Sequence, residues 1–332
     1  MRSRKHEAAS PSRVSRLCRF HLVMAIVILL VACGGNSDVD SGVTECEAGF
    51  RLFDHEKLYR GPVCVPDDPQ EIVSLGIEME TLVALGLSPT GAQERFIDDI
   101  GRNFPDQAGV LADTADIANP PNVESISSLN PDLIIGTTRE GQQEYRSLSQ
   151  IAPTILFTHV DSSEWKETAF FIADAINQTD EINQIFDEYN SRITDIQDQL
   201  STSGDLAVSV MRVRQGRIQV YLPGSFPGTV IGDIGLERPE SQQSDEFALE
   251  LSLEELKLAD ADIIYIYTFG ASPEQREASD QALSELYEER LWNSLDAVKN
   301  ESVYEMPDYW IGGGILAANA IVEDVLENLN EN

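Results

Sequence analysis

The chain has 332 residues, of which 42% are hydrophobic, and this is enough apolar material for two ordinary domains with a core each. It carries 57 acidic and 23 basic side chains, a formal net charge of −34. A surface of this sign repels nucleic acid and anionic lipid. We therefore expect two globular lobes and no nucleic-acid partner.

The first 32 residues have the pattern of a signal peptide. Six basic residues precede an uncharged apolar run from Leu22 to Ala32, about half the roughly 20 residues that a membrane-spanning helix needs. The run ends in Leu30-Val31-Ala32-Cys33 before two glycines, which resembles a bacterial lipobox. This resemblance implies cleavage before Cys33, a lipid on its thiol, and an extracytoplasmic protein anchored to the cell membrane. The alternative is an ordinary signal peptide with a chance cysteine.

Removal of residues 1–32 would leave 17 basic and 56 acidic side chains, a net charge of −39. Salt shortens the range over which such charges repel one another. We therefore interpret the acidity as an adaptation to a saline exterior. Melting temperature measured against salt concentration tests this hypothesis.

Two cysteines remain beyond the proposed lipid site. Cys46 and Cys64 are 18 positions apart and form an even pair in an oxidising compartment, which predicts a disulfide. Such a bond would contribute about 3 kcal/mol by constraining the unfolded chain. We expect residues 33–69 to be a tether followed by this disulfide-closed segment. Two cysteines without neighbouring histidines make a poor metal site.

From residue 70 onward, apolar strand patterns alternate with helical ones. Ile72–Leu75 reads as a strand before a short helix, and Leu133–Ile135 reads as a buried strand after a helix. Strands separated by helices predict an α/β fold with a parallel sheet. A helix followed by an Asp-led apolar strand occurs at 123–135 and again at 253–265, an offset of 130. This weak repeat favours two similar lobes, although general α/β sequence preferences produce similar matches.

One long helix is predicted between the two halves, over residues 179–201. About 22 residues at 1.5 Å each give a rod of roughly 33 Å, which suits a connection between an N-terminal lobe at 70–178 and a C-terminal lobe at 202–332. The alternative is a surface helix within one large domain. The apolar residues at helical spacing are Ile182, Ile185, Phe186, Tyr189, Ile193, Ile196 and Leu200.

Motifs of catalysis are missing from the sequence. It has no Gly-x-Ser-x-Gly elbow, no phosphate-binding loop and no His-Glu-x-x-His pair. Beyond the signal only His55 and His159 remain, too few for a zinc or manganese receptor, although His159 could reach a cleft. Tyr265 and Tyr267 share one strand face, which fits either packing or a direct ferric site. We predict a protein that is not an enzyme and holds no cofactor or metal of its own.

Seven segments keep one order and spacing along the chain, at 80–91, 130–135, 145–154, 210–221, 260–262, 292–298 and 309–319. Together, over about residues 70–330, they resemble the periplasmic binding proteins of iron-siderophore ABC transporters. The resemblance implies two Rossmann-like lobes joined by a single long helix, with the ligand cleft between the lobes. It implies a monomer that delivers a ferric siderophore to ABC transporter permease subunits. Alternatives are another chelate, such as cobalamin, haem or ferric citrate, and more remotely an extracytoplasmic lipoprotein enzyme.

Ligands of such folds lie beyond the carboxyl ends of the strands, so loops such as 76–80, 93–96, 137–141 and 268–270 should line the cleft. The resemblance places arginines at Arg139 and Arg212, and guanidinium groups suit an anionic chelate. It also implies one acidic residue on each lobe for docking to the permease. Glu80 matches that place in lobe one, and Asp233 stands near it in lobe two. The further ligand-binding candidates are Arg95, Phe226, Tyr309 and Trp310.

Overall fold

A computed structural model describes residues 45–158, 162–200 and 206–331. The proposed lipidation site Cys33 and the candidate His159 lie outside these residues. No helix within them combines the length and apolar character needed to cross a bilayer.

The described chain begins with a disulfide-closed hairpin. Strands β1 (Phe50–Phe53) and β2 (Val63–Pro66) pair antiparallel, and a disulfide joins Cys46 to Cys64. The residues between the strands run along β7 (Thr154–Phe157), where the Tyr59 amide donates to the Leu156 carbonyl at 2.9 Å. This contact covers an edge strand that would otherwise expose unpaired backbone groups. The segment is therefore part of the first lobe.

The first lobe is a parallel sheet of five strands in the order β5-β4-β3-β6-β7. Every residue of β6 is buried, which explains its continuous apolar sequence. The remaining strands are β3 (Ile72–Ser74), β4 (Gly91–Ala92), β5 (Ala115–Asp116) and β6 (Leu133–Thr137). The helices are α1 (Met79–Ala84), α2 (Glu94–Asn103), η1 (Pro105–Gln107), α3 (Val123–Ser128), α4 (Thr138–Gly141), α5 (Tyr145–Leu148), η2 (Ser162–Glu164) and α6 (Trp165–Ala175).

The second lobe repeats this strand order as β10-β9-β8-β11-β12, with β9 antiparallel to both of its neighbours, β8 and β10. Counted within each lobe, both orders are 3-2-1-4-5, the Rossmann arrangement. The strands are β8 (Val208–Arg214), β9 (Arg217–Tyr221), β10 (Ala248–Leu251), β11 (Ile263–Thr268) and β12 (Val303–Glu305). The helices are α8 (Phe226–Ile234), η3 (Glu240–Gln242), η4 (Leu253–Ala259), α9 (Pro273–Tyr287), η5 (Trp292–Ser294), α10 (Asp296–Lys299), η6 (Asp308–Ile311) and α11 (Ile315–Glu331).

The sequence repeat at an offset of 130 corresponds to one hydrogen-bond pattern in both lobes. The Asp132 amide donates to the Glu71 carbonyl at 2.9 Å, and its carboxylate accepts from the Glu71 amide at 3.1 Å. The Asp262 amide donates to the Ala207 carbonyl at 2.9 Å, and its carboxylate accepts from the Ala207 amide at 2.8 Å. Each aspartate therefore fastens the start of the fourth strand of its lobe to the start of the first.

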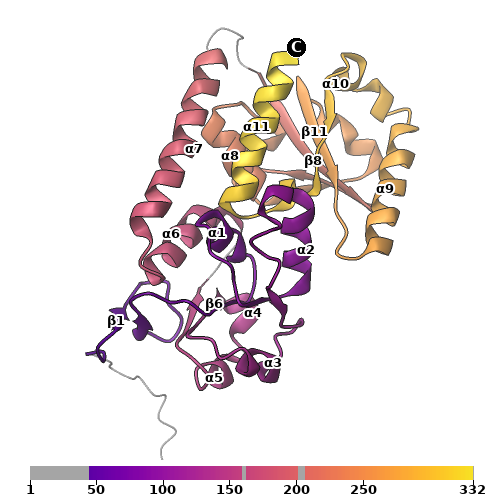
Figure 1. The fold of residues 1–332 in the computed structure, drawn as a ribbon. Helices are drawn as coiled ribbons and strands as arrows, with labels where there is room; N and C mark the ends of the chain where they lie inside the picture. Colours follow the sequence, from indigo (N-terminus) through magenta and orange to yellow (C-terminus); the bar gives the residue numbers. More distant parts are fainter. Residues whose placement is uncertain (1–44, 159–161, 201–205, 332) are drawn as a thin grey trace, which may run out of the picture. The chain divides into compact units, whose positions relative to one another are not determined.

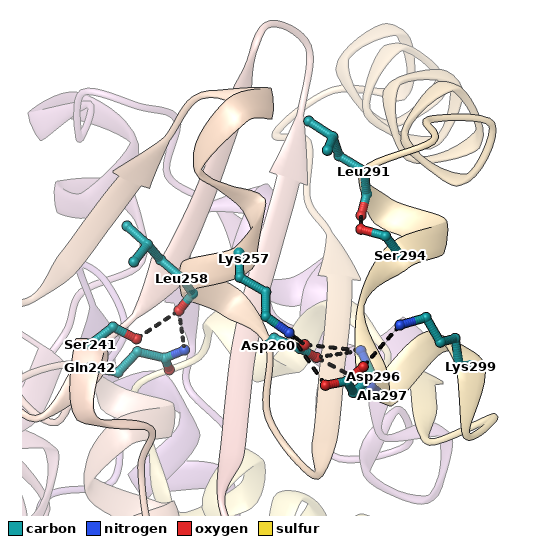
Figure 2. Close-up of polar contacts among 10 residues, drawn as sticks. All are labelled: Ser241, Gln242, Lys257, Leu258, Asp260, Leu291, Ser294, Asp296, Ala297 and Lys299. Atoms are coloured by element: carbon teal, nitrogen blue, oxygen red, sulfur yellow. Dashed lines mark hydrogen bonds and ion pairs between the residues drawn. The ribbon is translucent and has the colours of Figure 1, made fainter.

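A second polar network lies at the end of lobe two where β11 begins (Figure 2). The carboxylate of Asp260 accepts hydrogen bonds from the backbone amides of Asp296 and Ala297, which begin α10. Lys257 pairs with Asp260, and Lys299 pairs with Asp296 at 2.9 Å. The carboxylate thus satisfies amides at a helix start that have no partner within the helix.

Helix α7 runs from Thr179 to Leu200 between the two lobes (Figure 1). Its 22 residues coincide with the helix that the apolar spacing predicts. The helix packs against α6, α8 and α11. Together they form the largest core of the molecule, to which α7 contributes Ile182, Phe186, Tyr189, Ile193 and Ile196.

Candidate ligand-binding site

A cavity of about 140 Å³ lies between elements of the first and second lobes. One wall comes from the segment that begins α1 and from α2, and the other from the residue after β11 and from η6. Pockets for drug-sized ligands usually measure roughly 300 to 1,000 Å³. A bulky chelate therefore requires the lobes to separate or must extend beyond this cavity.

Two of the predicted ligand-binding residues line the cavity, as does Glu80, which was predicted for docking. The Arg95 side chain is exposed, and its guanidinium lies 4.1 Å from the centre of the Phe96 ring. Tyr309 stands opposite, with its ring 5.6 Å from that of Phe104. The Tyr309 hydroxyl donates to Asp324 at 2.7 Å, and burial followed by this carboxylate raises the pKa of the phenol. Both residues meet aromatic rings of lobe one.

Arg212 lies beside the cavity, near the carboxyl end of β8. Its guanidinium is 5.1 Å from the centre of the cavity-lining Phe269 ring, and its Nη1 donates to the Tyr221 hydroxyl at 3.1 Å. Its buried Nε has no hydrogen-bond partner among the described residues. Because β8 and β11 are the neighbouring strands at which the strand order reverses, Arg212 occupies the place where ligands of doubly wound sheets bind.

Arg139 of lobe one lies in α4, directly after β6, the fourth strand of that lobe and the counterpart of β11. Its side chain is exposed and is not among the groups that line the cavity. No salt bridge within the described residues involves Arg95, Arg139 or Arg212. In so acidic a chain, three arginines without a carboxylate partner are available to an anion.

The prediction that Trp310 and Phe226 contact the ligand is wrong, because both side chains are fully buried. The Trp310 ring lies 4.8 Å from that of Tyr265, and its Nε1 donates to Asp324 at 2.7 Å. Phe226 begins α8 and packs edge-on against Trp165 at 5.8 Å. These aromatics belong to the core around α7.

Other aromatic side chains line the cavity instead. They are Phe96, Phe104 and Phe269. Phe96, in the first turn of α2, and Phe269, directly after β11, lie in segments that the strand-end rule identifies, so the position of these segments was the available signal. Phe104 follows a helix, α2, and not a strand, so the strand-end rule does not identify it.

Tyr265 and Tyr267 pack in the core of lobe two. Both are almost fully buried, and burial raises the pKa of each hydroxyl above its ordinary value. No group of three or more histidine, cysteine, aspartate or glutamate side chains in the described part of the chain could hold a metal ion.

Glu80 and Asp233, the two predicted docking acids, both have partners inside the molecule. Glu80 Oε2 accepts from the Ala317 amide at 3.2 Å, in the first turn of α11, and burial raises its pKa to about 7. Asp233 accepts from the Tyr189 hydroxyl at 2.7 Å and pairs with Lys166 at 2.6 Å. Their role in docking stays a prediction.

Two contacts join the lobes beside the cavity. Arg102 of α2 pairs with Asp308 of η6 at 2.7 Å. At the start of α11, a Cβ on Gly314 would lie 2.5 Å from Glu80 Oε2, and one on Gly313 would lie 2.4 Å from Ile77 Cδ1. The glycines are therefore required for the close approach of the segment that begins α1.

Two similar α/β lobes, one connecting helix and a cavity between the lobes define a solute-binding protein of the two-lobed class. The chain belongs to the periplasmic binding protein family, whose model matches residues 107–310. It is 30% identical over 318 residues to the probable siderophore-binding lipoprotein YfiY of Bacillus subtilis, covering 92% of this chain and 95% of that protein. It is 27% identical to the achromobactin-binding periplasmic protein of Dickeya dadantii, covering 77% and 85%.

Solved structures show the same fold. SirA of Staphylococcus aureus, complexed with staphyloferrin B, superposes with a TM-score of 0.73 at 26% identity, covering 84% of this chain and 98% of that one. FeuA of Bacillus subtilis, complexed with ferri-bacillibactin, gives a TM-score of 0.67 at 24% identity, covering 85% and 99%. Members of this family bind a substrate and are not enzymes.

Proposed function

We propose that this chain is an extracytoplasmic lipoprotein that binds a ferric siderophore and delivers it to the permease of an ABC importer. The observation that carries the proposal is a set of three arginines that have no carboxylate partner among the described residues of a strongly acidic chain. Arg95 lines the cavity, Arg212 stacks on its wall, and Arg139 follows β6 of lobe one. The names of the relatives support a siderophore as the ligand.

The mechanism is binding without covalent chemistry. The chelate enters between the lobes, where guanidinium groups donate charge-assisted hydrogen bonds to its oxygens. The rings of Phe96, Phe104 and Phe269 contact its apolar frame. Because α7 is one uninterrupted helix, we expect the lobes to rock by a small angle on binding. The loaded protein then docks on the permease through acidic residues of both lobes.

Ferric citrate is the second candidate ligand. The chain is 27% identical to the Fe(3+)-citrate-binding protein YfmC of Bacillus subtilis, covering 93% of this chain and 97% of that one. A small citrate complex also fits the small cavity better than a large trimeric siderophore.

Calorimetric titration with ferric catecholate, hydroxamate and citrate complexes tests the proposal. Arg212→Ala should weaken the complex that binds by about 1 to 3 kcal/mol, because a charge-assisted hydrogen bond is lost. Arg290→Ala is the matched control, since Arg290 is exposed and does not line the cavity. Absence of binding to every ferric complex would refute the iron proposal, and an unchanged affinity would remove Arg212 from the site.

A further inference from the structure

Two carboxyl groups lie beside Gly76, in the loop of lobe one that leads to the cavity. Glu78 lies just before α1 and Glu140 lies in α4, so they follow the adjacent strands β3 and β6. A Cβ on Gly76 would lie 3.2 Å from Glu78 Oε2 and 3.1 Å from Glu140 Cδ. Both groups therefore border the same small space, which a larger residue at position 76 would fill.

The hydrogen bonds of Glu78 distinguish its two oxygens. Oε1 accepts from the Gly76 amide at 2.6 Å and from the Ser74 hydroxyl at 3.2 Å. Oε2 is buried and has no hydrogen-bond partner among the described residues. Glu78 itself is only 1% exposed. A buried polar atom without a hydrogen-bond partner lowers the stability of the fold, and a buried ionised carboxylate beside a second carboxylate lowers it further.

Glu140 can supply the missing partner. One of its oxygens accepts from the Thr137 hydroxyl. We propose that Glu78 is a neutral carboxylic acid whose proton lies on Oε2 and is donated to the Glu140 carboxylate. The single shared proton then ties the loop at Gly76 to helix α4.

The charge environment supports this assignment. Burial, and next the charge of Glu140, raise the pKa of Glu78 to about 8. Glu140 is the charged group that acts on Glu78, while the remaining contributions come from the hydroxyl of Ser74 and from backbone amides. Glu78 therefore keeps its proton at neutral pH and loses it at mildly alkaline pH.

The pair joins two parts of the candidate site. The loop at Gly76 leads into Ile77, Met79 and Glu80, which line the cavity, and α4 carries Arg139. Loss of the shared proton leaves two like charges in one space, so the loop and α4 should separate at high pH. The consequence for ligand affinity rests on the proposed function, whereas the shared proton does not.

Carbon-13 spectroscopy of glutamate carboxyl groups tests the proton directly. One carboxyl resonance should titrate near pH 8 in the whole protein and should be missing from the Glu78→Gln variant. Glu80→Gln identifies the second elevated titration, which we expect near pH 7. If the resonance removed by Glu78→Gln titrates below pH 6, the proposal is overturned.

Unfolding in urea between pH 5 and 9 gives an independent test. The folded protein holds a proton that the unfolded chain releases above about pH 4.5. The equilibrium constant for unfolding, taken relative to that of Glu78→Gln, should therefore rise about tenfold per pH unit up to about pH 8. The side-chain amide that Glu78→Gln introduces can donate to Glu140 at every pH, so this variant mimics the protonated state. Glu140→Gln should shift the transition to lower pH, because it removes the repelling charge.

Glu124→Gln is the control, since Glu124 is exposed in the first turn of α3. It should keep the pH profile of the parent protein. Parallel profiles for Glu78→Gln and the parent would contradict the shared proton. If added calcium chloride raises the stability at pH 9 and Glu78→Gln abolishes this gain, the pair binds a cation instead of sharing a proton, and the proposal is overturned. Titration of a ferric complex at pH 7 and 9 then measures the effect on binding separately.

Discussion

The polar groups of Trp310 and Arg212 have different kinds of partner. The Trp310 indole N–H and the Tyr309 hydroxyl donate to the same carboxylate, Asp324, although Trp310 is buried in the core and Tyr309 lines the cavity. Arg212 instead meets a hydroxyl and the face of a ring, so its charge is left for a ligand. Adjacent aromatic residues can therefore have different functions, one in the core and one at the cavity.

Trp310→Phe should lower the free energy of unfolding by about 1 to 3 kcal/mol, because a hydrogen bond to a charged group is lost in the core. Ligand affinity should not change, since Trp310 does not line the cavity. Tyr309→Phe removes the other hydrogen bond to Asp324 and also alters the cavity wall. Chemical unfolding and ligand titration of both variants check the prediction. A weaker ligand complex in Trp310→Phe at unchanged stability would contradict it.

The sequence predicted which segments contribute to the site more reliably than which side chains line it. Strand ends identify 93–96 and 268–270, and the structure places Phe96, in the first turn of α2, and Phe269 at the cavity. The exposure of an individual ring depends on contacts distant in sequence, as between Phe226 and Trp165. Spacing along the chain contains no information on such contacts, so the burial of Phe226 could not be predicted.

Among the elements, length and periodicity decided what could be predicted. Helix α7 repeats its apolar pattern over 22 residues, which leaves little ambiguity. Strands β4 and β5 have two residues each, too few to show any alternation. In the hairpin β1–β2, Phe50 and Leu52 are exposed, so its sequence looks like that of an ordinary surface segment. Its place in lobe one depends on pairing with β7, a contact between distant segments.

Replacing both Cys46 and Cys64 by serine should lower the free energy of unfolding by about 3 kcal/mol, because the 18-residue loop is no longer closed in the unfolded chain. Ligand affinity should be preserved, since the hairpin packs on Phe171 of α6 and not on the cavity. Urea unfolding and ligand titration check this. The parent protein under reducing conditions is the control and should lose the same stability. An unchanged unfolding midpoint would show that the disulfide does not stabilise the fold.

For the whole molecule, charge is the dominant property. With 57 acidic and 23 basic residues, the folded chain repels itself more strongly than a balanced protein does. Its salt bridges are mostly exposed and contribute little. Stability should therefore respond to ionic strength more through screening of repulsion than through loss of ion pairs.

The melting temperature should rise as sodium chloride increases from about 0.05 to 1 M, a range over which the Debye length falls to about 3 Å. Calorimetry in sodium chloride, with sucrose as a control for general exclusion effects, measures this. A melting temperature that is constant or falls with salt would refute the saline interpretation.

The disulfide between Cys46 and Cys64 also determines how tension enters the folded protein. A pull on the chain before Cys46 reaches Cys64 through the sulfur atoms, and it cannot peel β1 away from β2 one hydrogen bond at a time. The force then passes along the chain after Cys64, through the end of β2, to β3 of lobe one. Mechanical load applied at the leading end would thus enter lobe one at the start of β3, at the end of that strand opposite the cavity.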